Sequence, residues 1–151
     1  RAHREDPRFD FSATAMEYAK AVETELNALV FPALRRELGR KAPAQRETRV
    51  DGRPLDLGKP VPHQTLGVIR NLLEHEPIVA QGLTPLFPHD WRWLVGQLPV
   101  QLETLAALRN PAAHSKVLGR DPAVELRNNV LGVGAEGLVV QIARARMRRA
   151  R

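Results

Sequence analysis

Residues 10–38, DFSATAMEYAKAVETELNALVFPALRREL, carry a clear amphipathic pattern. Their apolar side chains recur at intervals of three and four residues, which places them on one face of an α-helix; they are Phe11, Ala15, Tyr18, Val22, Leu26 and Leu29. We therefore expect a helix that is capped at its start by Asp10 or Ser12 and ended by Gly39. Pro32 is expected to kink this helix or to divide it.

The stretch that follows, residues 39–62, has no helical period and contains four prolines and three glycines. This composition predicts a long loop, in which the sequence VDGR at 50–53 can form a short hairpin. A loop of this length is either functional or an excursion between helices.

Two further helices are predicted from apolar spacing. The first covers residues 63–76, where Pro62 should set its start and Pro77 should stop it. The second covers residues 88–109, where Pro99 must break or bend it.

A last helix is expected to begin with Asp121 as its cap and Pro122 in its first position. Its apolar and small side chains are spaced by 7, 4, 3, 4 and 3 residues, a packing seam of heptad type; they are Val124, Leu131, Ala135, Leu138, Ile142 and Ala145. Gly132, Gly134 and Gly137 lower helix propensity within it, which makes sense where another backbone approaches closely.

The predicted fold class is therefore all-α, a compact bundle of four to five helices in a single domain of 151 residues. The chain has no cysteine, so neither disulfides nor thiolate metal sites are available. No apolar run approaches 18 residues, and no hydrophobic signal segment is present, so we expect a cytoplasmic protein without membrane contact. Because the sequence starts at Arg1, we expect it to be a piece of a longer protein.

The net charge of +6 is concentrated at the C-terminal end. Residues 141–151 contain five arginines and no acid, which leaves a net charge of +1 for the rest of the chain. Residues 143–151 therefore form a basic tail, whose candidate RNA-binding side chains are Arg144, Arg146, Arg148 and Arg149. Such a tail can contact phosphates. It can equally be a solvated helix end, where cations suit the helix dipole.

Several catalytic motifs are absent from the sequence, among them the phosphate-binding P-loop, His-Glu-x-x-His and the nucleophile elbow. The spacing Gly132-x-Gly134-x-x-Gly137 fits a dinucleotide loop, but no strand precedes it. His63, His75 and His89 lack a paired metal-ligand spacing. We expect neither a metal ion nor a cofactor.

One short motif combines groups that suit RNA cleavage. Residues 109–114, RNPAAH, offer a fixed cation (Arg109), an amide (Asn110) and an imidazole (His114). Asn110 followed by Pro111 predicts a helix cap and a new helical turn, whose N–H groups and dipole would favour a bound phosphate. A cation and a proton-transferring imidazole are the parts needed for attack by a 2′-hydroxyl without a metal.

The same spacing occurs a second time in residues 70–75, RNLLEH. There Arg70 and His75 stand about 140° apart on a helix, and Leu72 and Leu73 face the core. Glu74 would compete for the arginine. We interpret this second copy as structural.

The motif at 109–114 resembles the Arg-x4–6-His motif of HEPN domains, in the form with Asn directly after Arg. In that family the motif lies between the last two long helices of a compact helical bundle, and the order of elements here is similar over residues 10–147. The resemblance implies a metal-independent endoribonuclease that acts as a homodimer, with two copies of the motif facing one RNA-binding cleft. Family members serve in toxin–antitoxin, antiviral-defence and RNA-processing systems, often with a fused domain or an antitoxin partner.

Carried onto this chain, the resemblance makes His114 the acid and base and Arg109 the phosphate-binding cation, while Asn110 orients the substrate. Glu23 is the candidate polar residue on the first helix, with Glu25 behind it; both lie at the edges of the apolar stripe, where a carboxylate either reaches solvent or points into a polar pocket. We expect dimerisation through the last helix. Two alternatives stay open: a non-catalytic module of the same fold that binds a partner, and an unrelated helical domain whose arginine tail binds nucleic acid.

Overall fold

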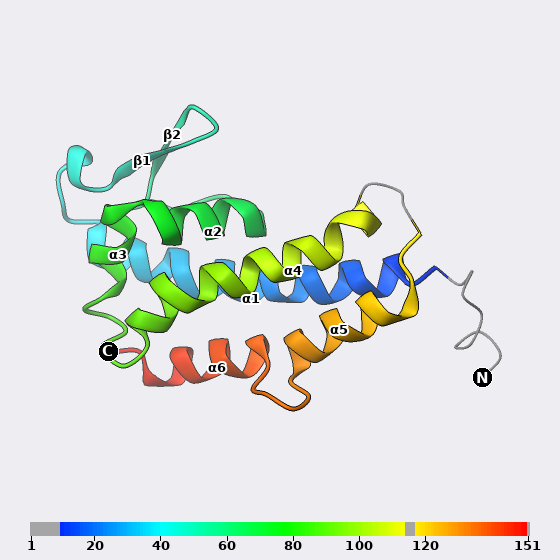
Figure 1. Cartoon of the computed structure of the whole chain (residues 1–151). Helices are drawn as coiled ribbons and strands as arrows, with labels where there is room; N and C mark the ends of the chain where they lie inside the picture. Colours follow the sequence, from blue (N-terminus) through cyan, green and yellow to red (C-terminus); the bar gives the residue numbers. More distant parts are fainter. Residues whose placement is uncertain (1–9, 114–116, 151) are drawn as a thin grey trace.

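The computed structural model describes residues 10–113 and 117–150, and these form a compact helical bundle (Figure 1). In chain order its elements are α1 (Ser12–Leu38), η2 (Pro43–Gln45), β1 (Glu47–Val50), β2 (Arg53–Asp56), α2 (Leu66–His75), α3 (Pro77–Leu83), η3 (Trp93–Gln97), α4 (Leu98–Ala113), α5 (Arg120–Leu131) and α6 (Leu138–Arg148). The prediction of an all-α bundle is confirmed. The described residues form six α-helices rather than four or five.

Helix α1 lies in the middle of the bundle and contacts each of the other α-helices. Its buried side chains face several directions because neighbours cover it on several sides; they include Ala15, Val22, Leu26, Leu29 and Leu34, all 0% exposed. The expected end at Gly39 is correct, but the residue at the N-cap is Phe11 and not Asp10 or Ser12. Pro32 does not divide the helix, which continues through it to Leu38.

The predicted hairpin in the 39–62 loop is present. Strands β1 and β2 pair in antiparallel register, with Val50 opposite Arg53. Asp51 and Gly52 form the turn with φ of 50° and 75°. Two successive positive φ angles give the turn the right-handed twist that a two-residue hairpin needs, and Asp-Gly is among the pairs that tolerate them.

Helix α2 was predicted to start at residue 63, directly after Pro62. It starts at Leu66, because Thr65 is the N-cap residue. The Thr65 side chain accepts a hydrogen bond from the Val68 N–H. Pro77 ends α2 as expected, but it also begins α3, a helix that the sequence pattern did not predict. Proline suits the first turn of a helix because the N–H that it lacks would have no partner there.

The chain before α4 accommodates Pro99 by a π-helical turn, η3. Pro99 has no N–H to donate to the carbonyl four residues earlier, and just before it Leu98 N–H donates to Trp93 O, five residues back. Pro111, in contrast, does not break the helix: α4 runs through Asn110 and Pro111 to Ala113. The predicted cap at Asn110 and new turn at Pro111 are therefore wrong.

The predicted last helix is two helices. Helix α5 is preceded by Gly119 and has Asp121 in its first turn rather than at its cap. It ends at Gly132, and α6 begins after Gly137. The three glycines form the connection: Gly132 and Gly134 have φ of 90° and 79°, in the region that favours glycine. The heptad spacing continued across this turn because α5 and α6 both pack on α1.

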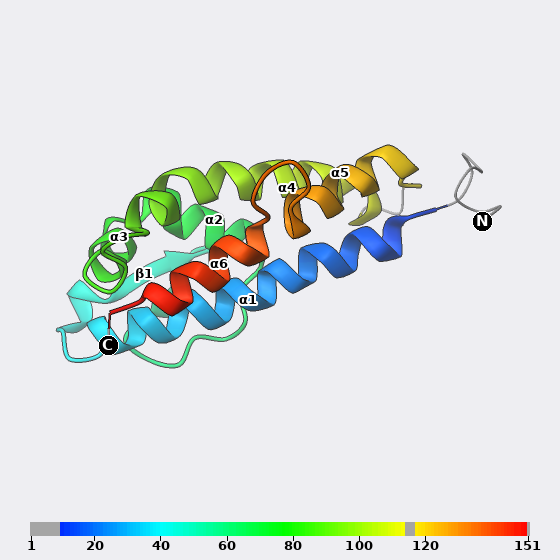
Figure 2. The ribbon, with the colours of Figure 1, turned by 90° about the horizontal axis from the view of Figure 1, so that it is seen from below.

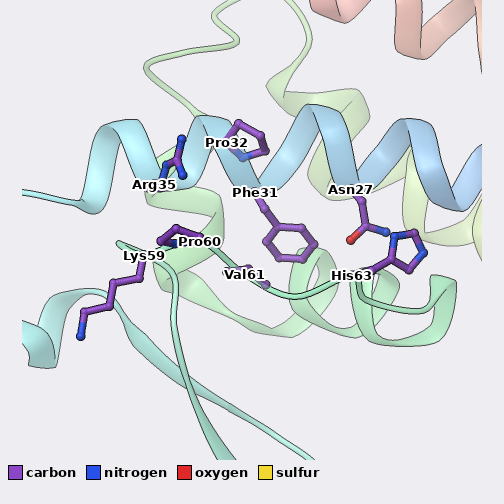
Figure 3. Close-up of a pocket in the computed structure, with 8 residues that line it drawn as sticks. All are labelled: Asn27, Phe31, Pro32, Arg35, Lys59, Pro60, Val61 and His63. Atoms are coloured by element: carbon purple, nitrogen blue, oxygen red, sulfur yellow. The ribbon is translucent and has the colours of Figure 1, made fainter.

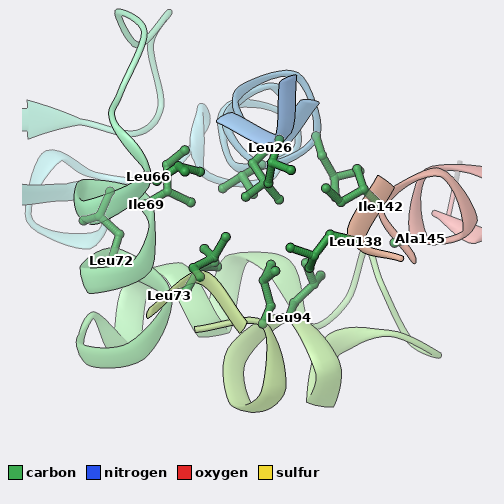
Figure 4. Close-up of a cluster of buried hydrophobic side chains, with 14 of the residues drawn as sticks. Leu26, Leu66, Ile69, Leu72, Leu73, Leu94, Leu138, Ile142 and Ala145 are labelled. Carbon is green, nitrogen blue, oxygen red and sulfur yellow. The ribbon is translucent and has the colours of Figure 1, made fainter. Parts of the chain in front are cut away.

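Side chains from α1, α2, η3 and α6 meet in one hydrophobic core (Figure 4). Seen from below, α6 runs along α1 (Figure 2). The seam residues Leu138, Ile142 and Ala145 are 2%, 0% and 0% exposed. They pack inside the chain, so this part of the seam is not free to contact a second copy. None of the helices in the described part of the chain combines the length and the hydropathy of a membrane span.

The α5–α6 turn makes a prediction for stability. A Cβ added at Gly137 would lie 2.3 Å from the Leu131 carbonyl carbon and 2.4 Å from the Gly132 nitrogen. Backbone atoms cannot move aside as a flexible side chain can, so Gly137→Ala should lower the free energy of unfolding by about 1–3 kcal/mol. Urea unfolding followed by circular dichroism measures this.

Gly96→Ala is the matched control, because Gly96 is exposed and a Cβ there would meet nothing within 4 Å. It should be neutral or stabilising by up to about 1 kcal/mol. Equal effects of the two substitutions would contradict the close packing of the turn.

Candidate functional site

The first part of the predicted motif lies in the last turns of α4. Asn110 is exposed, whereas Arg109 is partly buried. The Arg109 Nε is buried and has no hydrogen-bond partner, and within the described residues its guanidinium forms no ion pair. His114 lies outside the described residues. Among the described residues, Arg109 is therefore a cation without a carboxylate partner at the end of α4.

The chain that follows the motif is attached to the start of α1. Leu118 is buried; its N–H donates to Asp10 Oδ1 at 3.1 Å, and its carbonyl accepts from the Phe11 N–H at 3.0 Å. Hydrogen bonds from the Ser12 side chain, the Ser12 backbone and the Leu118 backbone lower the pKa of the Asp10 carboxyl. These contacts fix the chain shortly after the position of His114.

Glu23 has two partners, and neither belongs to the motif. Its Oε1 lies 2.8 Å from His63 Nε2, and its Oε2 accepts from the Leu66 N–H at 3.0 Å. The Glu23 carboxylate thus accepts a hydrogen bond from one of the N–H groups at the start of α2, which have no partner within that helix. No hydrogen bond in the described part of the chain joins it to Arg109 or Asn110, so a role beside the motif stays a prediction.

Asn27, one helical turn after Glu23, holds the same segment of chain. We call residues 59–65 the strap. The Asn27 amide donates to Gln64 O and accepts from Gln64 N–H, each at 2.8 Å. Sequence reasoning missed Asn27 and His63, although the i, i+4 spacing of Glu23 and Asn27 placed two polar side chains on one helix face.

A pocket of about 270 Å³ lies between α1 and the strap (Figure 3). The Phe31 ring points from α1 toward Val61, and Asn27 lies beside His63. Lys59 extends away from this pocket toward Asp56, 3.5 Å from its Oδ2. Because Asn27 and His63 are already engaged, the pocket is mainly the junction at which the strap closes on α1.

Three of the four arginines predicted to bind RNA have carboxylate partners. Arg144 pairs with Glu136, Arg146 with Glu25 on α1, and Arg148 with Asp90. Arg149 forms no ion pair within the described residues. The end of the chain is further attached by a hydrogen bond from Ala150 N–H to Leu86 O. Residues 143–150 are thus docked on the bundle.

The second copy of the motif has a different environment from the first. Arg70 pairs with Glu103 of α4 at 3.5 Å, and Glu74 pairs with His75 instead of with the arginine. Leu72 and Leu73 are buried, as predicted. Here the arginine joins two helices and its charge is compensated.

Within residues 10–113 and 117–150 no group of three His, Asp or Glu side chains is placed to hold a metal ion. Comparison of the chain with protein-family models, curated protein sequences and solved structures gave no match.

The contacts of Glu23 predict a stabilising role. Glu23→Ala removes the acceptor of the buried Leu66 N–H, so it should lower the free energy of unfolding by about 1–2 kcal/mol, as the loss of a helix cap does. Glu25→Ala on the same helix breaks an exposed ion pair and should cost about 1 kcal/mol or less. Chemical unfolding of both variants measures the difference; equal losses would contradict the role assigned to Glu23.

The tail arginines give a second prediction. The Asp90 side chain is 8% exposed and its Oδ2 has no hydrogen-bond partner, so Arg148→Ala leaves a buried carboxylate without its cation. We expect a loss of about 1–3 kcal/mol in stability. Arg144→Ala should cost about 1 kcal/mol or less, because Glu136 can be hydrated. Thermal unfolding of both variants would contradict this if Arg144→Ala were the more damaging.

Proposed function

We propose that this chain is a metal-independent endoribonuclease domain that acts through Arg109, Asn110 and His114. The observation that carries the proposal is the state of Arg109. It is a partly buried cation at the end of a bundle helix, and it has no carboxylate partner in the described part of the chain. Arg144, Arg146 and Arg148, and Arg70 of the second copy, are all ion-paired. An anion is therefore better received at Arg109 than at these other arginines.

The chemistry follows from the residue types. His114 accepts the proton of an RNA 2′-hydroxyl, whose oxygen attacks the adjacent phosphorus and displaces the 5′-oxygen of the next nucleotide. The leaving oxygen takes a proton from the His114 imidazolium, which restores the neutral imidazole, and the products are a 2′,3′-cyclic phosphate and a 5′-hydroxyl. Arg109 stabilises the negative charge that develops on the phosphate oxygens, since its guanidinium stays charged and presents paired donors. Asn110, exposed beside it, orients the strand.

A dimer, as the HEPN resemblance implies, would need a surface other than Leu138, Ile142 and Ala145, which are buried in the chain. Exposed apolar side chains are available near the α5–α6 turn: Leu131, Val133 and Val140 are 48%, 63% and 46% exposed. The same side chains favour the second candidate function, a non-catalytic module of this fold that binds a partner.

An RNA-cleavage assay in excess EDTA tests the proposal. Arg109→Ala and His114→Ala should each reduce cleavage by about 100-fold or more. His75→Ala is the matched control, because it removes the imidazole of the second copy and should leave the rate unchanged. The products of the parent chain should end in 2′,3′-cyclic phosphate, and circular dichroism should show that all variants fold.

Each outcome has one meaning. Cleavage that survives both motif substitutions contradicts the proposed site. Absence of cleavage by the folded parent chain, tested on several RNAs at concentrations where it is dimeric, contradicts the enzyme and favours the binding module.

A further inference from the structure

A second hollow of the surface lies between the start of α1 and α5, near the end of the bundle that carries Arg109. We call it the α1–α5 groove; it measures about 290 Å³ and is lined chiefly by Phe11, Thr14, Tyr18, Arg120, Val124 and Arg127. Figures 1 and 2 both show these two helices side by side at this end. The sequence pattern gave no reason to group these residues, since they come from segments about a hundred positions apart.

The groove has the charge and the surface that a nucleic-acid strand needs. Both of its charged lining residues are arginines, and no acid of the described chain lines it. Arg120 forms no ion pair with a described residue, and among these residues the Arg127 guanidinium binds the neutral Asn128 Oδ1, at 2.9 and 3.2 Å. Their charges are therefore available to phosphates, unlike those of the α6 arginines.

Aromatic side chains line the same groove as these cations. Tyr18 and Phe11 are partly buried there, and the lining also includes the exposed Thr14, which carries a hydroxyl. Any of the four bases can stack on an aromatic ring, while arginines bind the phosphates of the RNA backbone. A hydroxyl and a phenol add donors for phosphate or sugar oxygens.

The groove is also connected to the motif. Phe11, which lines it, donates its N–H to the carbonyl of Leu118. Leu118 follows Ala113, the last residue of α4, by five positions in the sequence, so the two residues are at most about 18 Å apart. One short strand of RNA can therefore reach from the groove to the end of α4.

We propose that the α1–α5 groove binds single-stranded RNA, with Arg120 and Arg127 on phosphates and Tyr18 against a base. This rests on the proposed function in taking RNA as the substrate. The proposal places the bound RNA on the α1–α5 face instead of on the arginines of α6. The recognition is independent of sequence, because every contact is to the backbone or to the flat face of a base.

The test is fluorescence anisotropy with a labelled single-stranded 2′-O-methyl RNA, which binds but cannot be cleaved by its own 2′-oxygen. Arg120→Gln with Arg127→Gln should weaken binding by about tenfold or more. The same double variant should lower the slope of log K against log salt by about 1.4, the value for two lost phosphate contacts on a single strand. Tyr18→Leu should weaken binding at constant salt slope, and Tyr18→Phe should restore most of it.

The matched control is Arg49→Gln with Arg53→Gln in the hairpin, which removes two exposed arginines without ion pairs in the described chain and so changes the net charge equally. It should leave the affinity within about twofold. An equal loss in this control would overturn the groove as the site, because the effect would then come from net charge. Full affinity of the Arg120/Arg127 variant for the RNA would overturn the groove as well. The same holds if poly-glutamate displaces the labelled RNA as effectively as unlabelled RNA does.

The groove and the enzyme can fail separately. A parent chain that binds 2′-O-methyl RNA through the groove and leaves unmodified RNA intact would contradict the nuclease and support the groove. A parent chain that cleaves RNA while the groove variants keep its KM would support the nuclease and overturn the groove.

Discussion

The burial of α1 on several sides is the constraint on which the rest of the structure depends. Amphipathic helices of this length usually bury one stripe, but α1 buries Leu34 and Leu38 as well as the stripe of Ala15, Val22, Leu26 and Leu29. Each leucine or valine side chain removed from water stabilises the fold by about 1.5–3 kcal/mol. The other five helices all pack on α1, so each of them buries apolar side chains against this one helix. Four of those helices, α2, α3, α5 and α6, have only 7 to 12 residues, a length at which an isolated helix is marginal in water. The bundle is therefore one core around one helix.

The sequence predicted those elements whose signal is local. The period of residues 10–38 identified α1, and Asp51-Gly52 identified the hairpin, because both depend on neighbours in the chain. Proline was ambiguous: Pro77 both stops one helix and starts the next, and Pro111 is tolerated inside α4. The heptad seam across Gly132–Gly137 was misleading, because two helices that share one partner keep the same spacing of apolar residues.

The candidate site was predictable only in part, for the same reason. Arg109 and Asn110 were selected because they are adjacent in the sequence, and their role stays a prediction. The partners of Glu23 are about forty residues away and depend on the path of the strap. The sequence of the arginine-rich tail contains no acid, which suggests that its arginines have no carboxylate partners. In the fold, however, Arg146 forms an ion pair with Glu25, about 120 positions earlier in the chain. The α1–α5 groove could not be predicted from the sequence. Its two arginines lie among ordinary helical residues, and nothing local indicates that they face α1.

The turn between α5 and α6 also bears on how this sequence can diverge. Leucines of the core can exchange with isoleucine or methionine, because volume and apolarity are what the core requires. At Gly132 and Gly137 a Cβ would lie within 2.6 Å of facing backbone atoms, so any other amino acid there forces the main chain to shift. The turn therefore favours the pattern Gly-x4-Gly at these positions. Two residues without side chains are thus more narrowly constrained in type than the leucines of the buried core.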